Sequence, residues 1–110
     1  MLYIFSEHVR GENLDEKEIV KRLSKDEAFV SWMKQHNRVF IREVQRGASK
    51  MYYNVEYIVG KFLVFTHFEG KHENKTYITP RGALAYLSRK GLLIDYICLS
   101  PLGRVKPCMT

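Results

Sequence analysis

The sequence predicts a single α+β domain over residues 1–110, and three observations support this class. The chain has 110 residues, 45% of them hydrophobic, which is sufficient for one core. Apolar residues recur at helical spacing near both ends of the chain. Between these ends, residues 62–79 contain two runs typical of paired strands, separated by a turn with a glycine.

Two helices are expected in the first third of the chain, after a short apolar run at residues 2–5 that predicts a strand. Asn13 with Glu16 resembles a capping box, and the apolar stripe that follows predicts a helix over residues 14–23. Ser24 with Glu27 repeats this pattern and predicts a second helix over residues 25–36. We interpret Trp32 as an aromatic of the core or its flank.

The clearest local signals belong to a helix over residues 80–90. Thr79 is a favourable N-cap, Pro80 is preferred at the first helical position, and Gly91 suits the left-handed residue after a helix. The following segment, residues 92–100, is apolar and β-branched. With residues 2–5 it predicts either a homodimer interface or an extra strand pair on the same monomer.

The periodicity of residues 49–61 is compatible with two structures. A helix would place these apolar side chains on one side: Met51, Val55, Ile58, Val59 and Phe62. A strand would place a different set on one face: Met51, Tyr53, Val55, Tyr57 and Val59. In the second case residues 38–79 become a four-stranded antiparallel meander, with Gly60 and Lys61 in a tight hairpin turn.

The order of elements from residue 28 to residue 90 resembles winged helix-turn-helix DNA-binding domains, most closely in the stretch KTYITPRGALAYLSRKG. The resemblance implies an extended bridge at residues 38–40, a short second helix at 41–46 and a turn at Gly47. It favours a recognition helix over residues 49–61 and makes residues 62–79 a hairpin wing with the loop EGKHEN. Residues 1–25 and 92–110 become extensions of this core.

The same resemblance implies the residues that would contact DNA. Those of the recognition helix would serve base readout and phosphate contacts: Ser49, Lys50, Tyr52, Tyr53, Asn54 and Tyr57. The tip of the wing would meet phosphate or the minor groove through Lys71, His72 and Lys75. Arg46 and Arg81 are further candidates for phosphate contacts.

The positive charge is concentrated in one part of the chain. Residues 1–43 contain eight Lys or Arg and eight Asp or Glu, whereas residues 44–110 contain ten and four, which gives net charges of 0 and +6. A positive field over a short segment attracts phosphate. The expected partner is therefore double-stranded DNA.

Enzymatic, metal-binding and membrane functions receive no support from sequence motifs. The four histidines lack metal-ligand spacing, and phosphate-loop, dinucleotide and nucleophile motifs are absent. We therefore expect no catalysis, metal or cofactor. Cys98 and Cys108 indicate reduced thiols, the chain has no long apolar run, and its first residues do not resemble a signal peptide. These features predict a cytoplasmic protein.

Two functional hypotheses follow from these observations. The first is a DNA-binding transcriptional regulator, working as a homodimer on a two-fold site. The second is a small α+β protein-interaction module or inhibitor of viral or mobile-element type, in which the aromatic-rich residues 51–68 bind another protein. The state of residues 49–61 discriminates between them, because a helix supports the first hypothesis and a strand supports the second.

Overall fold

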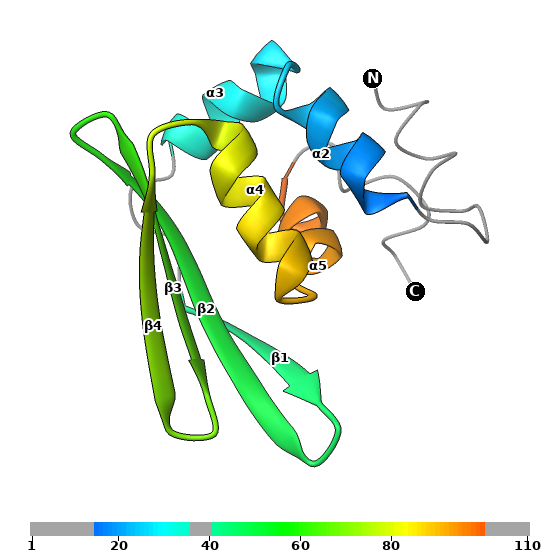
Figure 1. Ribbon diagram of the computed structural model, residues 1–110, viewed down its shortest axis with the longest axis vertical. Coiled ribbons are helices and arrows are strands. Elements are labelled where there is room, and N and C mark those ends of the chain that lie inside the picture. The colour runs from blue at the N-terminus through cyan, green and yellow to red at the C-terminus, as the bar shows by residue number, and fades with distance from the viewer. Residues whose placement is uncertain (1–14, 36–40, 101–110) are drawn as a thin grey trace.

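The computed structural model describes residues 15–35 and 41–100, in which helices pack on one side of a four-stranded antiparallel sheet (Figure 1). This arrangement confirms the α+β class. The predictions for residues 2–5, Asn13, residues 38–40 and Cys108 lie outside the described residues. The elements, in chain order, are α2 (Glu16–Leu23), α3 (Glu27–Gln35), β1 (Arg42–Arg46), β2 (Ser49–Ile58), β3 (Lys61–Phe68), β4 (Lys71–Tyr77), α4 (Pro80–Arg89) and α5 (Leu93–Cys98).

The sheet is a simple meander in the order β1-β2-β3-β4, so β2 and β3 are its central strands. Only two residues join each pair of strands, because Arg46 faces Ser49, Ile58 faces Lys61 and Phe68 faces Lys71. Each turn contains a glycine at positive φ, the conformation that tight hairpins require: Gly47, Gly60 and Gly70. The sheet therefore agrees with the four-stranded alternative, although its middle turn consists of Val59 and Gly60 and not of the expected Gly60 and Lys61.

The expected recognition helix is wrong, because residues 49–58 form the central strand β2. A helix would have buried Ile58 and Val59, yet their side chains are 43% and 90% exposed. Strand alternation instead buries Met51, Tyr53 and Val55 on one face. The expected second helix at residues 41–46 is also wrong, because Arg42–Arg46 pairs with β2 as the edge strand β1.

The hairpin of β3 and β4 was predicted with the wrong loop. Residues 69–74 were expected to form a loop, but the connection is the two-residue turn of Glu69 and Gly70. Consequently Lys71, His72 and Lys75 do not lie at the tip of a wing. They belong to the edge strand β4, whose Lys71 pairs with Phe68 and whose His72 pairs with His67.

Local signals placed α4 correctly and misplaced the starts of α2 and α3. The Thr79 side chain accepts from the Gly82 amide at 3.2 Å, and Gly91 follows α4 at φ 71°. In α2 the cap is Asp15, which accepts from the Glu18 amide at 3.3 Å. In α3 the Asp26 side chain accepts from the Phe29 amide at 3.0 Å, two residues after the expected cap Ser24.

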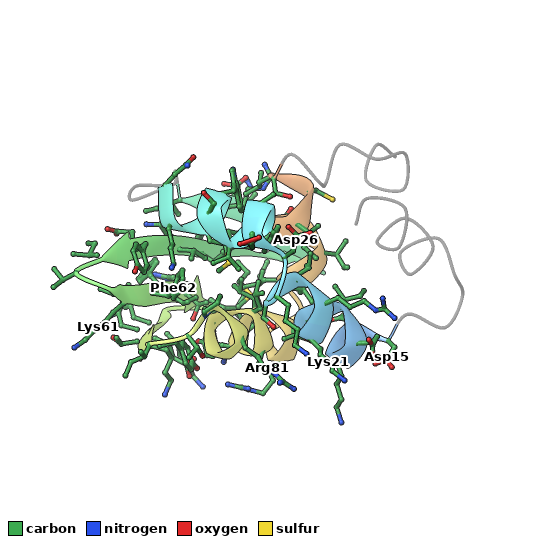
Figure 2. The ribbon with its side chains drawn as sticks, turned by 90° about the horizontal axis from the view of Figure 1, so that it is seen from above. Asp15, Lys21, Asp26, Lys61, Phe62 and Arg81 are labelled. Atoms are coloured by element: carbon green, nitrogen blue, oxygen red, sulfur yellow. The ribbon has the colours of Figure 1, made fainter. Side chains whose placement is uncertain are left out.

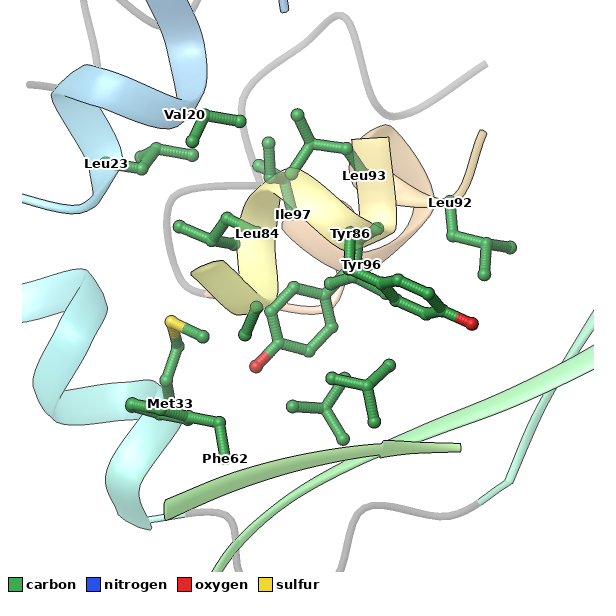
Figure 3. Packing of buried hydrophobic residues seen from close by; sticks show 14 of the residues in the cluster. Val20, Leu23, Met33, Phe62, Leu84, Tyr86, Leu92, Leu93, Tyr96 and Ile97 are labelled. Atoms are coloured by element: carbon green, nitrogen blue, oxygen red, sulfur yellow. The ribbon is translucent and has the colours of Figure 1, made fainter. Parts of the chain in front are cut away.

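The core lies between the sheet and the helices, and α5 is at its centre (Figure 3). Tyr96 and Ile97 of α5 are fully buried, as are Leu92 and Leu93 at its start. The extra strand that was one of the two expected uses of residues 92–99 is therefore wrong, because Leu93–Cys98 is a helix of the core, and Cys98 lies in this helix and not in a strand. Trp32 packs against the core, as predicted.

A charged contact between α5 and the sheet fixes their relative position. Asp95 of α5 accepts from the Arg42 guanidinium at 3.0 Å and from the Tyr53 hydroxyl at 2.6 Å. Burial and this hydrogen bond to Asp95 raise the pKa of Tyr53 well above its usual range. Tyr53 therefore stays protonated and serves as a hydrogen-bond donor inside the fold.

Candidate interaction surface on the sheet

One face of the sheet carries no helix among the described residues, and we call it the outer face. Strand alternation determines its members, because neighbours of the buried residues on each strand point the opposite way. Figure 2 shows this at the start of β3, where Phe62 points between the layers and Lys61 points away. The outer face consists of Glu43, Gln45, Lys50, Tyr52, Asn54, Glu56, Ile58, Lys61, Leu63, Phe65, His67, His72, Asn74 and Thr76.

Four rings form a continuous cluster across the centre of the outer face. Tyr52 meets His67 edge-on with ring centroids 6.1 Å apart, and His67 meets His72 at 4.1 Å. Phe65 lies next to His72 at 5.9 Å. Cross-strand register brings them together, because Tyr52 faces His67 on β3 and His67 faces His72 on β4. This ring cluster presents a rigid, amphipathic surface to solvent.

The charges of the outer face largely neutralise one another. The ammonium of Lys50 lies 3.3 Å from the carboxylate of Glu43, and the Asn54 amide donates to Glu56 at 3.3 Å. Together with Lys61, the face has two lysines and two glutamates, so it has no net charge apart from its histidines. The side-chain oxygen of Asn54 is buried and has no hydrogen-bond partner, which leaves one acceptor unsatisfied.

Exposed apolar side chains gather at the end of the sheet that carries the turn between β2 and β3. Ile58 and Leu63 belong to the outer face, Val59 lies in the turn, and Ile78 directly follows β4. The register places them at one end, because Ile58 faces Lys61 and Phe62 faces Tyr77. We call these four residues the apolar end.

Val59 is unusual in conformation as well as in exposure. Its φ is 50° and it is followed by Gly60 at φ 75°, the pair of positive angles that defines a type I′ hairpin turn. This turn favours Asn or Asp at the first position, whereas a β-branched residue is strained in the left-handed region. Because the side chain is 90% exposed, burial inside the monomer does not compensate for that strain.

The residues expected to bind nucleic acid divide between the two sides of the sheet. The outer face brings together Lys50, Tyr52, Asn54 and His72. Tyr53 is 1% exposed and Tyr57 packs on Phe62 with ring centroids 4.7 Å apart, so the exposed positions expected for these two are wrong. Ser49 donates to Glu69 at 3.2 Å in the adjoining turn.

The other expected cations lie on the helix-covered side. Arg46 donates to the Gly91 carbonyl after α4, and Lys71 and Arg89 line the same pocket. Arg81 and Arg89 line a groove against Lys17 of α2, and Figure 2 shows Arg81 on the solvent side of α4. We call this set the basic side: Lys17, Arg46, Lys71, Lys75, Arg81, Arg89 and Lys90.

Several residues of the outer face and of the basic side could not be identified from the sequence, because their position depends on how the strands pair. Phe65, His67 and Leu63 were recognised only as part of a strand, although they form the middle of the outer face. For Arg89 and Lys90 the sequence predicts only the end of a helix, with no indication of the cluster of cations around them. The strand alternative for residues 49–61 was the signal that could have identified the outer face.

Metal sites, membrane-spanning helices and similarity to known proteins also bear on function. No group of three or more His, Cys, Asp or Glu side chains is placed there to hold a metal ion. None of the helices in residues 15–35 and 41–100 has the length and apolar character needed to cross a membrane. No family model matches the chain, and no curated protein or solved structure is significantly similar to it.

Proposed function

We propose that this protein is a small protein-interaction module that binds another protein through the outer face and the apolar end. The observation that carries the proposal is Val59, a β-branched residue that is held at φ 50° and is 90% exposed. Strain and exposure at one residue are costly in the free monomer. Insertion of the Val59 side chain into a partner would bury it, and this burial would offset both the strain and the exposure.

The composition of the outer face also favours a protein partner. Protein interfaces are enriched in aromatic residues and depleted of charge at their centre, whereas nucleic-acid interfaces are strongly positive. The ring cluster and the apolar end match the first description, and the positive charge lies on the basic side. We therefore expect a partner with an apolar surface of low charge, into which Val59 and Leu63 would insert.

The proposal is tested by measuring which proteins the wild type and two matched variants recover from the source cells. Leu63→Lys places a charge in the middle of the surface, and because Leu63 faces Glu56 across the strands, the new lysine gains an opposite charge and the sheet is retained. Arg81→Glu is the control, because it also changes the charge of one surface residue but lies on the basic side. We expect the wild type and the Arg81→Glu protein to recover the same protein from the source cells in stoichiometric amount, and Leu63→Lys to lose it.

Two outcomes of this experiment would contradict the proposal. If Leu63→Lys retains the partner while Arg81→Glu loses it, the binding surface is the basic side. If no protein is recovered stoichiometrically by the wild type, the outer face has no protein partner in that cell. Sedimentation of the purified protein shows whether the occupant is instead a second copy, as in the expected homodimer.

Binding to duplex DNA is a second proposal, supported by the position of the basic side. Its cations come from α2, α4 and two strands and include Arg81, Arg89 and Lys71. A surface of this kind would displace counterions from several phosphates, so affinity should fall steeply with salt. A titration of duplex DNA across salt concentrations tests it, and flat dependence or absence of binding at low salt would exclude it.

A further inference from the structure

A pocket of about 350 Å³ lies where the sheet continues beyond the C-terminal end of α4. Figure 1 shows β2, β3 and β4 extending past the helices at this end. The sheet provides an apolar floor from Met51 of β2 and Phe68 of β3, with the Thr66 hydroxyl beside them. This volume lies within the range of small-molecule sites. The pocket is on the helix-covered side, away from the outer face.

The walls of the pocket carry four cations and one carboxylate: Arg46, Lys71, Arg89, Lys90 and Glu73. Three of the cations, Arg46, Arg89 and Lys90, sit at the C-terminal end of α4, where the helix dipole favours positive charge. Lys71 comes from the edge strand and gains nothing from that dipole.

Within the described part of the chain, three of the four cations in the pocket have no carboxylate partner, and one of these three, Arg46, donates instead to the backbone carbonyls of Lys90 and Gly91. Glu73 accepts from the Tyr86 hydroxyl and lies 3.0 Å from the Lys90 ammonium, and these two bonds lower its pKa. Arg89 donates to the Tyr77 hydroxyl at 3.4 Å and its guanidinium lies 5.7 Å from the centroid of the Tyr86 ring, but it has no carboxylate partner among the described residues. Among the described residues Lys71 has no ion-pair partner. Arg89 and Lys71 thus leave uncompensated positive charge over an apolar floor.

We propose that this pocket binds a phosphate monoester attached to a planar ring, with a nucleoside monophosphate as the representative ligand. Lys71 and Arg89 would contact the phosphate, because an ammonium and a guanidinium form strong charge-assisted hydrogen bonds with phosphate oxygens. The ring would lie on Phe68 and Met51, where stacking on an aromatic side chain is favourable for any base. The pocket is larger than a phosphate ion alone requires, so the apolar floor accounts for the rest of the ligand.

Calorimetric titration of the full chain with adenosine monophosphate, adenosine and inorganic phosphate tests the proposal. Adenosine monophosphate should bind, and adenosine and phosphate should each bind at least about tenfold more weakly. Lys71→Ala should weaken the binding of adenosine monophosphate by about tenfold or more, since it removes one of the two cations proposed to contact the phosphate. Lys61→Ala is the matched control, because this lysine starts the neighbouring strand and points away from the body of the protein.

A second titration shows whether the phosphate belongs to a free nucleotide or to the end of a nucleic-acid strand. It compares an oligonucleotide that carries a 5′-phosphate with the same strand ending in a 5′-hydroxyl. Preference for the phosphorylated strand over both the hydroxyl strand and free adenosine monophosphate supports the site and assigns it to a strand end. Absence of binding by every phosphate ligand at low salt overturns the proposal. Equal losses in Lys71→Ala and Lys61→Ala overturn it as well, because only general charge would then matter.

Discussion

Within residues 15–35 and 41–100, two residues other than glycine occupy the left-handed region, both at equivalent turn positions, and they differ in chemistry. Val59 and Glu69 both have φ 50°, and each precedes a glycine in a two-residue hairpin turn. Glu69 is polar, and its carboxylate accepts from the Ser49 hydroxyl at 3.2 Å. Val59 is apolar and projects into solvent. Val59 and Glu69 therefore share the strain of the left-handed conformation, but only Val59 also exposes an apolar side chain to water.

Replacing either residue with asparagine should stabilise the fold. Asn tolerates the left-handed conformation better than Glu and much better than Val, and Asn-Gly is the preferred type I′ pair. We expect Val59→Asn to raise the free energy of unfolding by about 1 kcal/mol and Glu69→Asn by less. Urea denaturation measures both. A loss of stability in Val59→Asn would show that the Val59 side chain contributes to the monomer.

Helices and strands were predicted correctly where the residues that determine them are close together in the sequence. The end signals of α4 lie within the helix and its flanks, so Thr79 and Gly91 located it correctly. The choice for residues 49–58 depends on pairing with β1 and β3, which periodicity within the segment cannot reveal. Three of its six expected contact residues, Lys50, Tyr52 and Asn54, nevertheless lie on the outer face, because alternate residues of a strand point to opposite sides of the sheet.

Substitution of adjacent tyrosines tests whether residues 49–58 form a strand. Tyr53 is buried and donates to Asp95, whereas Tyr52 lies on the outer face. Tyr53→Ala should lower the free energy of unfolding by roughly 3–5 kcal/mol, as expected for a large buried side chain. Tyr52→Ala should cost about 1 kcal/mol or less. Similar small losses for both, measured by denaturation, would restore the helical interpretation in which Tyr53 is exposed.

At the scale of the whole molecule, exposed apolar side chains and clustered cations lie on opposite sides of the sheet. The outer face combines rings and apolar residues with paired charges such as Lys50 and Glu43. The basic side gathers cations around α4 and the pocket above Phe68. Because the sheet lies between the two surfaces, each can take a partner without contacting the other. If both proposals hold, a protein and a phosphate-bearing ligand would therefore bind at the same time.

The fold as a whole should be lost at high pH because tyrosines must stay protonated. Burial and the hydrogen bond to Glu73 raise the pKa of Tyr86 to about 12, and burial raises the pKa of Tyr96 above its usual range. The unfolded value is about 10. A raised pKa contributes stability that is present below pH 10 and is lost as pH rises through about 12.

Alkaline titration followed by tyrosinate absorbance and circular dichroism checks this expectation. The absorbance of Tyr53, Tyr86 and Tyr96 should appear only together with loss of the fold. Tyr86→Phe should flatten the decline in stability above pH 10, because one raised pKa is then absent. Complete titration of all tyrosines near pH 10 with the fold intact would contradict the burial of these side chains.

The affinity of Val59→Asn for the protein recovered by the wild type tests the central claim most directly, with Glu69→Asn as its matched control. If Val59 is strained in order to insert into a partner, Val59→Asn should fold more stably and yet bind at least about tenfold more weakly. Glu69→Asn changes the equivalent turn of the next hairpin, at the opposite end of β3, and should retain full affinity. Unchanged affinity in Val59→Asn would contradict the assignment of the apolar end as a binding surface.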